Sequence, residues 1–111
     1  MDFKFSIIIP VHYETDVLRK CLTSIFNQTY KNFEVICILD NASPQVEQSL
    51  EGFSVLYTKC NYNCPGLTRN LGLYYAQGDY VWFIDADDAI PSNTVLEEIN
   101  CALQDQPDEL V

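Results

Sequence analysis

The stretch that decides the fold is Tyr80-Val81-Trp82-Phe83-Ile84-Asp85-Ala86-Asp87-Asp88, where five apolar or aromatic residues run into three carboxylates. Such an uninterrupted apolar run is typical of a parallel strand that is covered on both faces. The acids follow at its carboxyl end, which is the edge of an open α/β sheet where ligands bind. Asp85 and Asp87, spaced D-x-D, can reach one hard divalent cation, which takes carboxylate oxygens as ligands. We therefore expect a metal-bridged phosphate site after this strand.

Composition limits the possible partners of this chain. Its 111 residues suit one domain, and a hydrophobic content of 48% is enough for a packed core. The formal net charge is -10, so the field of the protein repels nucleic acid, and we expect no nucleic-acid partner. Two like unit charges ~4 Å apart cost about 4 kcal/mol at an effective dielectric constant near 20. A phosphate beside Asp85 and Asp87 therefore needs a cation between them.

The five cysteines are an odd number, which favours buried reduced thiols in a cytosolic protein over a disulfide framework. Cys60-x-x-x-Cys64 could be half of a zinc site, but the sequence has no second pair. No apolar run approaches the ~20 residues of a membrane span. We expect a cytoplasmic protein, with the inner face of the membrane as an alternative location for the full-length protein.

Strand patterns alternate with helix patterns along the whole chain, which predicts right-handed crossovers and a doubly wound, mainly parallel α/β sheet. The expected strand order is 3-2-1-4. The expected strands are 5–10, 33–39, 53–58 and 80–84, and the expected helices are 16–27, a short one from Pro44, 67–75 and 95–103. We assign residues 1–104 to one domain and 105–111 to a polar tail or truncation point.

Residues at the predicted helix ends match known capping signals. Thr15 and Ser43 are candidate N-caps, and Gly78 is a candidate C-cap. Thr94-x-x-Glu97 matches a capping box before the last helix. These signals fix the expected boundaries of the helices.

Acidic residues follow three of the four predicted strands. The loops after the first, second and fourth strands lie along one edge of a parallel sheet, so Glu14, Asp40 and Asp85 with Asp87 can converge there. In the order 3-2-1-4 the chain reverses direction between strands one and four. The crevice at that point is the expected ligand site.

Six patterns occur in order along almost the whole chain, and a lone D-x-D would be much weaker support. They are Ser6-Ile7-Ile8-Ile9-Pro10-Val11-His12-Tyr13-Glu14, Cys21-Leu22-x-Ser24-Ile25-x-x-Gln28-Thr29-Tyr30, Phe33-Glu34-Val35-Ile36, Asp40-Asn41-Ala42-Ser43, Pro65-Gly66-x-Thr68-Arg69-Asn70-x-Gly72-Leu73, and Gly78-Asp79-Tyr80 leading to Asp85-Ala86-Asp87-Asp88. Together they resemble the nucleotide-sugar half of the family-2, GT-A-type inverting glycosyltransferases. The resemblance implies sugar transfer from a nucleotide diphosphate sugar, with UDP-sugars favoured, to a saccharide or lipid-linked acceptor with inversion.

The resemblance also implies roles for single residues. Pro10, Val11 and Glu14 would flank the nucleotide, and Asp40 would accept hydrogen bonds from the base. Arg69, one of only two arginines in the chain, would lie near the diphosphate or the acidic cluster.

At the metal site, the resemblance implies that Asp87 ligates Mn²⁺ or Mg²⁺, the Lewis acid for the departing diphosphate. Asp85 would support the metal, directly or through bound water, or reach the ribose.

Two departures from the family pattern affect these expectations. His12-Tyr13 replaces the usual Tyr-Asn, and Asn41-Ala42 replaces the commoner Asp-Gly, so contacts to the base can differ in detail. The family's general base is a carboxylate well downstream of the D-x-D, beyond the end of this chain. We therefore assign no catalytic base here, and expect little or no transferase activity from the chain alone.

Simpler interpretations stand beside each of these roles. An isolated D-x-D is often only a solvated loop, Glu14 could cap the first helix, and Asp40 could form an Asx-type turn. Arg69 could form a structural ion pair, and His12 has no partner visible in the sequence.

Three other classes of protein are alternatives to a glycosyltransferase. A phospho-receiver needs an acidic pair after the first strand and a late lysine, and both are missing. A nucleotidyltransferase-like domain normally has a glycine-rich basic loop after its first strand, where residues 10–15 have neither feature. A non-catalytic nucleotide-binding or interaction fragment stays open.

Overall fold

Four parallel strands form one sheet in the predicted order β3-β2-β1-β4. The computed structural model describes residues 2–104, so the proposed tail at 105–111 lies outside the described residues. The elements are β1 (Phe5–Val11), α1 (Asp16–Phe26), β2 (Phe33–Asp40), α2 (Pro44–Gln48), β3 (Leu56–Cys60), α3 (Pro65–Tyr75), β4 (Tyr80–Phe83) and α4 (Val95–Gln104).

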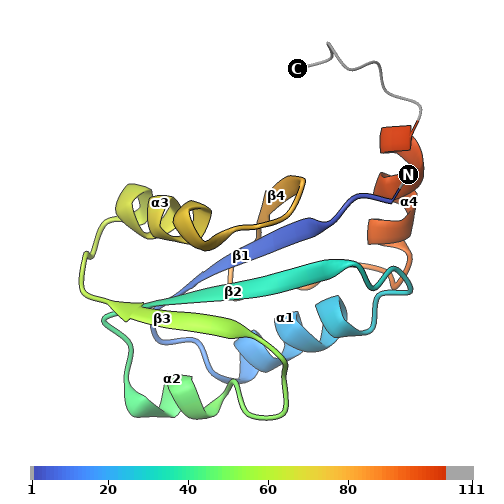
Figure 1. Ribbon diagram of the computed structural model, residues 1–111. Coiled ribbons are helices and arrows are strands. Elements are labelled where there is room, and N and C mark those ends of the chain that lie inside the picture. The colour runs from blue at the N-terminus through green and yellow to red at the C-terminus, as the bar shows by residue number, and fades with distance from the viewer. Residues whose placement is uncertain (1, 105–111) are drawn as a thin grey trace.

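Helices cover both faces of the sheet, which makes a three-layer α/β arrangement (Figure 1). Helices α1 and α2 lie on one face and α3 lies on the other, while α4 stands at the end of the sheet where β1 begins (Figure 1). Within residues 2–104, no helix combines the length and the apolar character that a membrane crossing requires.

Alternate residues of the two central strands point to opposite faces, as the two-residue period of a strand requires. Ile7 and Ile9 belong to the larger core cluster under α1, together with Leu18 and Leu22 of that helix. Ile8 belongs to a second cluster with Ile36 and Ile38, against which Leu71 of α3 packs. Both faces of β1 and β2 are therefore buried, and this explains their continuous apolar sequences.

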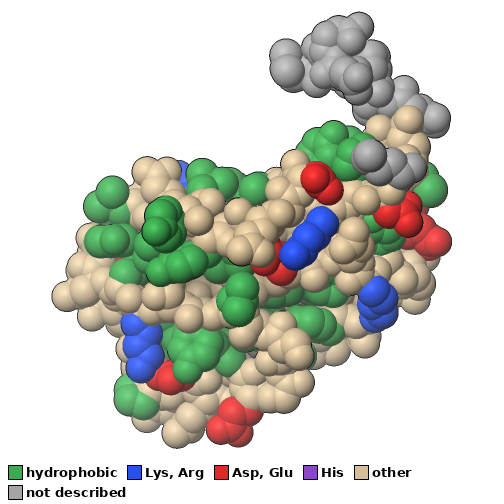
Figure 2. Space-filling view, in the orientation of Figure 1, with side chains coloured by type: hydrophobic (Ala, Val, Ile, Leu, Met, Phe, Trp, Pro, Cys, Tyr) green, Lys and Arg blue, Asp and Glu red, His purple; other side chains and the backbone are tan. Residues whose placement is uncertain are grey.

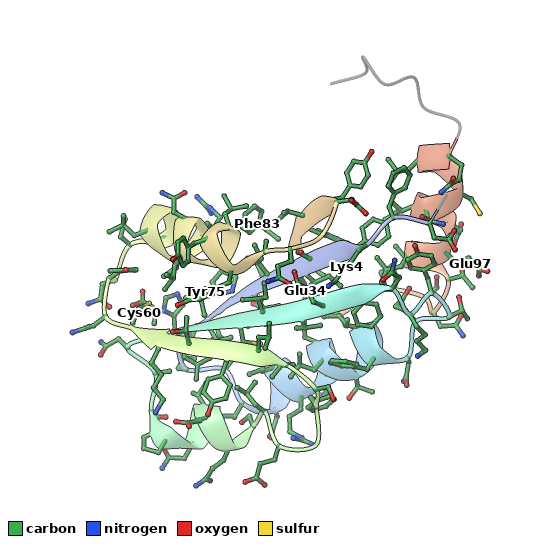
Figure 3. All side chains as sticks on the ribbon, in the orientation of Figure 1. Lys4, Glu34, Cys60, Tyr75, Phe83 and Glu97 are labelled. Atoms are coloured by element: carbon green, nitrogen blue, oxygen red, sulfur yellow. The ribbon has the colours of Figure 1, made fainter. Side chains whose placement is uncertain are left out.

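The expectation that the strand from Tyr80 is covered on both faces is wrong. Strand β4 is short and lies at the edge of the sheet, and Tyr80 and Phe83 keep 40% and 39% of their surface exposed. Phe83 and Tyr75 lie on the α3 side of the sheet (Figure 3). Figure 2 shows apolar side chains gathered over α3 and towards β3, where Leu56 and Tyr74 are exposed. An apolar run therefore identifies a strand without settling its coverage.

Some predicted boundaries and caps also differ. Strand β3 is Leu56–Cys60 rather than 53–58, and α3 ends at Tyr75 with Ala76, not Gly78, in the C-cap position. Thr15 and Ser43 occupy N-cap positions but make no capping hydrogen bond with their side chains.

The predicted capping box of α4 does not form either. The Thr94 hydroxyl donates to Glu98, and Glu97 accepts a hydrogen bond from Thr29. Thr29, which follows α1, therefore hydrogen-bonds the Glu97 carboxylate that the capping box would have used.

Gly78 has a packing role in place of a cap. A Cβ added there would lie 2.6 Å from Ser6 Oγ and 2.8 Å from the Lys4 carbonyl oxygen. The Gly78 amide donates to Ser6 Oγ, which in turn donates to Glu34. Side-chain volume at this position would separate the start of β4 from β1.

Replacing Gly78 by alanine should lower the free energy of unfolding by about 1–3 kcal/mol, because backbone atoms must move to admit the methyl group. Chemical denaturation followed by circular dichroism measures this change. Gly66→Ala is the matched control, since nothing lies within 4 Å of a Cβ there. The control should be neutral or stabilising by up to about 1 kcal/mol, as expected for alanine in a helix. Equal stability of G78A and the wild type would contradict the packing role.

Candidate functional site

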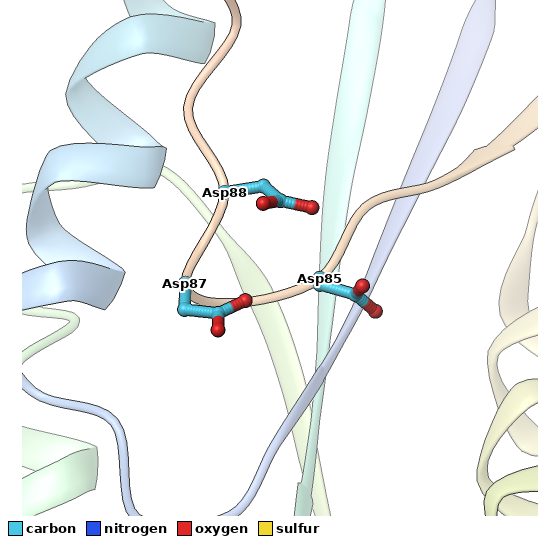
Figure 4. A group of neighbouring side chains, drawn as sticks. All are labelled: Asp85, Asp87 and Asp88. Atoms are coloured by element: carbon cyan, nitrogen blue, oxygen red, sulfur yellow. The ribbon is translucent and has the colours of Figure 1, made fainter.

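Three carboxylates share one tight turn directly after β4. The Asp88 amide donates to the Asp85 carbonyl oxygen across the turn, at 3.0 Å. One carboxylate oxygen from each of Asp85, Asp87 and Asp88 lies within 4.8 Å of the others (Figure 4). The sequence singled out Asp85 and Asp87 as metal ligands, and the structure adds Asp88 as a third candidate. Within residues 2–104 no other group of three His, Cys, Asp or Glu residues is this close.

Buried residues between and beside the acids hold the turn on the core. Ile84, Ala86 and Ile90 are buried in the larger cluster, while the three aspartates are exposed. The apolar side chains therefore fix the path of the backbone, and the carboxylates are left facing solvent.

The chemistry of this group suits a hard divalent cation. Mg²⁺ and Mn²⁺ prefer carboxylate oxygens and commonly bind through a few of them together with water and phosphate. Without a cation the three negative charges repel one another at short range. The donor set of Asp85, Asp87 and Asp88 therefore fits the metal that the resemblance implies.

Cys21 of α1 lies beneath the turn, and its thiol is 3.8 Å from the Asp85 carbonyl oxygen. Burial, followed by the nearby charges of Asp88 and Asp87, raises the pKa of Cys21 to about 11. The thiol is therefore protonated at neutral pH and acts as a donor to the backbone, not as a thiolate ligand.

The other cysteines only partly follow the expectation of buried thiols. All five are free, and Cys37 is buried, with its pKa raised to about 12 by burial and by the neighbouring Cys21. Cys64 and Cys101 are exposed. Cys60, at the carboxyl end of β3 (Figure 3), lies 3.6 Å from Asp40 Oδ1. Among the described residues, no His, Cys, Asp or Glu joins both Cys60 and Cys64 in a group close enough to share one zinc ion.

Asp40 forms a second polar centre at the end of β2. Its Oδ1 accepts hydrogen bonds from the amides of Tyr62 and Asn63, at 2.8 and 3.2 Å, and so ties β2 to the loop before α3. These bonds reach another loop, which rules out a merely local Asx turn. Asp40 is 0% exposed, and within residues 2–104 its Oδ2 has no hydrogen-bond partner. A buried oxygen of this kind costs about 1–3 kcal/mol unless a donor reaches it.

His12 lies beside this unpaired oxygen. The sequence shows no partner for His12, and this contact is therefore a finding of the structure. Its Nδ1 is 3.9 Å from Asp40 Oδ2 and 3.3 Å from the Asp40 carbonyl oxygen. The position of His12 directly after β1, next to the end of β2, is the signal that could have predicted the contact.

Glu14 closes the loop between β1 and α1 and does not cap the helix. Its Oε1 accepts from the amides of His12 and Tyr13, at 2.8 and 3.2 Å. Pro10 is partly exposed, whereas the side chain of Val11 is fully buried. Val11 therefore can flank a ligand only through its backbone.

Arg69 is exposed on the first half of α3. Within residues 2–104 it forms no ion pair, so the structural ion pair considered as an alternative is absent there. Its charge is available to a ligand.

The two polar centres flank the end of β1. Asp40 follows the neighbour on one side, β2, and the acidic turn follows the neighbour on the other side, β4. Adjacent strands are ~4.8 Å apart, so β2 and β4 lie about 10 Å apart on the two sides of β1. One end of an elongated ligand can bind at Asp40 while its anionic end reaches the acidic turn.

Comparison with known proteins yields a consistent set of relatives. The model of the family described as Glycosyl transferase family 2 matches residues 6–111. The poly(ribitol-phosphate) beta-glucosyltransferase of Bacillus spizizenii is 33% identical over 114 aligned residues, which cover 95% of this chain and 18% of that protein. Glycosyltransferase GlyA of Streptococcus pneumoniae is 36% identical over 100 residues, which cover 86% and 14%. The chain thus spans less than a fifth of the length of these relatives.

Solved structures agree with the sequence matches. The crystal structure of Staphylococcus aureus TarS residues 1–349 superposes with a TM-score of 0.84 at 28% identity, covering 91% of this chain and 32% of that one. The same protein in complex with UDP-GlcNAc gives a TM-score of 0.80 at 27% identity, covering 91% and 31%.

Neutralising one acid of the turn should stabilise the metal-free protein. We expect Asp88→Asn to raise the free energy of unfolding by up to about 1 kcal/mol at low ionic strength, because like charges are removed. The gain should shrink as salt is added. Urea denaturation in the presence of EDTA, at two salt concentrations, measures both effects.

Asp16→Asn is the matched control, since it removes the same charge from the first turn of α1. It should lower the free energy of unfolding by about 0.3–1 kcal/mol, because an acid favours a helix N-terminus. A loss of stability in D88N would contradict mutual repulsion within the turn.

Proposed function

The chain belongs to glycosyltransferase family 2, and we propose that it binds the donor for an enzyme that transfers a sugar from a nucleotide diphosphate sugar. The proposed reaction inverts the configuration at the sugar carbon. The observation that carries this proposal is the group of three carboxylates at the ligand-binding edge of the sheet.

In the proposed complex, Asp87 and Asp85 hold Mn²⁺ or Mg²⁺, with Asp88 as a further ligand or as a partner of bound water. When bound, the ion supplies Lewis acidity that neutralises the departing diphosphate. The short turn keeps the carboxylates close together before the donor arrives.

Asp40 is proposed to receive the base. Its Oδ2 is buried and lacks a donor among the described residues, so a base N–H that reaches it removes an unfavourable unpaired oxygen. Uracil offers such a donor at N3. His12 lies beside the same oxygen, and in this proposal it would border the base. Pro10, the backbone of Val11 and Glu14 would line the nucleotide on the β1 side.

Arg69 is proposed to approach the diphosphate. In an acidic chain, an exposed guanidinium without an ion pair among residues 2–104 is suited to an anionic ligand. Its location on α3 places it on the opposite face of the sheet from α1.

The nucleotide is proposed to be UDP, a choice supported by TarS, whose crystal structure contains UDP-GlcNAc. The Bacillus relative is named as a poly(ribitol-phosphate) beta-glucosyltransferase, and this name supports a polyol phosphate polymer as the acceptor. No residue of this chain is proposed as the catalytic base, so its role is confined to the donor.

UDP binding should depend on the metal and on Asp87. Isothermal titration with UDP is expected to show binding in the presence of Mn²⁺ and none with EDTA. Asp87→Asn should weaken Mn²⁺-dependent binding at least tenfold, on the order of 1.4 kcal/mol, since a charged ligand is lost. Glu51→Gln is the control, because it removes one exposed acid from the turn before β3. UDP binding that is independent of Mn²⁺ or of Asp87 would contradict the proposed site.

A modified ligand tests Asp40 without changing the protein. UDP methylated at N3 of uracil lacks the donor for Asp40 Oδ2, and its added methyl group would meet a buried oxygen. We expect its affinity to fall roughly tenfold or more compared with UDP. Competition against UDP in the presence of Mn²⁺ gives the ratio. Equal affinity of the two ligands would show that the base does not bind Asp40 in this way.

A further inference from the structure

One face of α1 is hydrogen-bonded to the segment that follows the acidic turn. Ser24 Oγ accepts from the Ile90 amide at 2.9 Å and donates to the Cys21 carbonyl oxygen at 2.6 Å. Ile90 comes two residues after Asp88, so this bond holds the chain just beyond the last acid. Ile90 lies outside the helices and strands, so its amide has no backbone partner there, and the Ser24 hydroxyl accepts its hydrogen bond.

Gln28, just beyond the end of α1, extends the same contact. Its Nε2 donates to the carbonyl oxygens of Ser92 and Ser24, at 2.6 and 3.1 Å, and its Oε1 accepts from the Leu96 amide at 3.1 Å. Gln28 is fully buried, so both of its donors and its acceptor are used without competition from water.

The entry to the turn is also fixed. The Ile84 amide donates to the Ile8 carbonyl oxygen of β1 at 3.0 Å, and the Cys21 thiol contacts the Asp85 carbonyl oxygen. The acids therefore lie between one anchor on β1 and another on α1. Repulsion among the three carboxylates opposes this arrangement, so the anchors act against a force that would open the turn.

We propose that Ser24 and Gln28 are positioning residues that preorganise the acidic turn for its metal by holding the chain after it. This inference rests on the proposed function, because it concerns the affinity of the metal site described above. Neither residue touches the metal or the donor in this proposal. They keep Asp85, Asp87 and Asp88 close enough to share one ion, so less of the binding free energy is used to order the turn.

Ser24→Ala removes the acceptor for the Ile90 amide while leaving every carboxylate in place. We expect the dissociation constant for Mn²⁺ to rise about three- to tenfold, as for the loss of one hydrogen bond. Ser24→Thr keeps the hydroxyl and should restore an affinity close to that of the wild type. Thr23→Ala is the matched control, since its hydroxyl bonds only within α1, to the Arg19 carbonyl oxygen.

Electron paramagnetic resonance of free Mn²⁺ measures these affinities well below the melting temperature of each variant. A role in stability alone would lower the melting temperature without changing Mn²⁺ affinity. Equal affinity of S24A and the wild type would overturn the positioning role. Failure of the wild type to bind Mn²⁺ through Asp87 would instead overturn the proposed function, and the positioning role with it.

Hydrogen exchange of the unmutated, metal-free protein gives a second test that does not depend on whether a variant folds. The amides of Ile90 and Leu96 should exchange far more slowly than those of exposed loop residues, because side chains of Ser24 and Gln28 hold them. Rapid exchange of the Ile90 amide in the folded protein would overturn the proposal, since the turn would then lack its anchor before metal binds.

Discussion

The mutual repulsion of three aspartates in one turn is the constraint around which this end of the molecule is arranged. Asp85, Asp87 and Asp88 would separate in a free loop, but buried Ile84, Ala86 and Ile90 fix the backbone between and beside them. The burial of apolar side chains supplies the free energy that keeps the charges together. The proposed cation would relieve the repulsion and would therefore couple stability to ligand binding at the same residues.

Sheet topology converts this local arrangement into an extended site. Because β1 lies between β2 and β4, Asp40 and the acidic turn are two strand spacings apart on the same edge. Each centre has a feature that a ligand could complete: an unpaired buried oxygen at Asp40, and excess negative charge at the turn. A nucleotide diphosphate with a divalent cation offers a donor at one end and a cation at the other. The same ligand therefore answers both features, which is the physical basis of the proposed donor site.

The alternation of strands and helices and the acidic turn could be predicted from the sequence because both depend on local patterns. Continuous apolar runs at Ile7–Ile9 and Val35–Leu39, with helical spacing between the strands, indicate a parallel sheet, and D-x-D after a strand indicates the edge of the proposed site. Features that depend on distant partners were missed. Two of these features are contacts between residues far apart in sequence, His12 with Asp40 and Gly78 with Ser6. The third is the exposure of β4, which depends on how the rest of the chain covers that strand. Glu97 likewise bonds Thr29 and not the expected cap.

In the proposed complex, one divalent ion would join the acidic turn to the diphosphate of a nucleotide whose base lies at Asp40. Anomalous diffraction from crystals of this chain grown with Mn²⁺ and UDP tests it most directly. We expect one manganese peak at coordination distance from the Asp87 carboxylate and from a phosphate oxygen, with the uracil ring at Asp40 Oδ2. A manganese ion away from Asp85, Asp87 and Asp88, or UDP bound on another edge of the sheet, would contradict it.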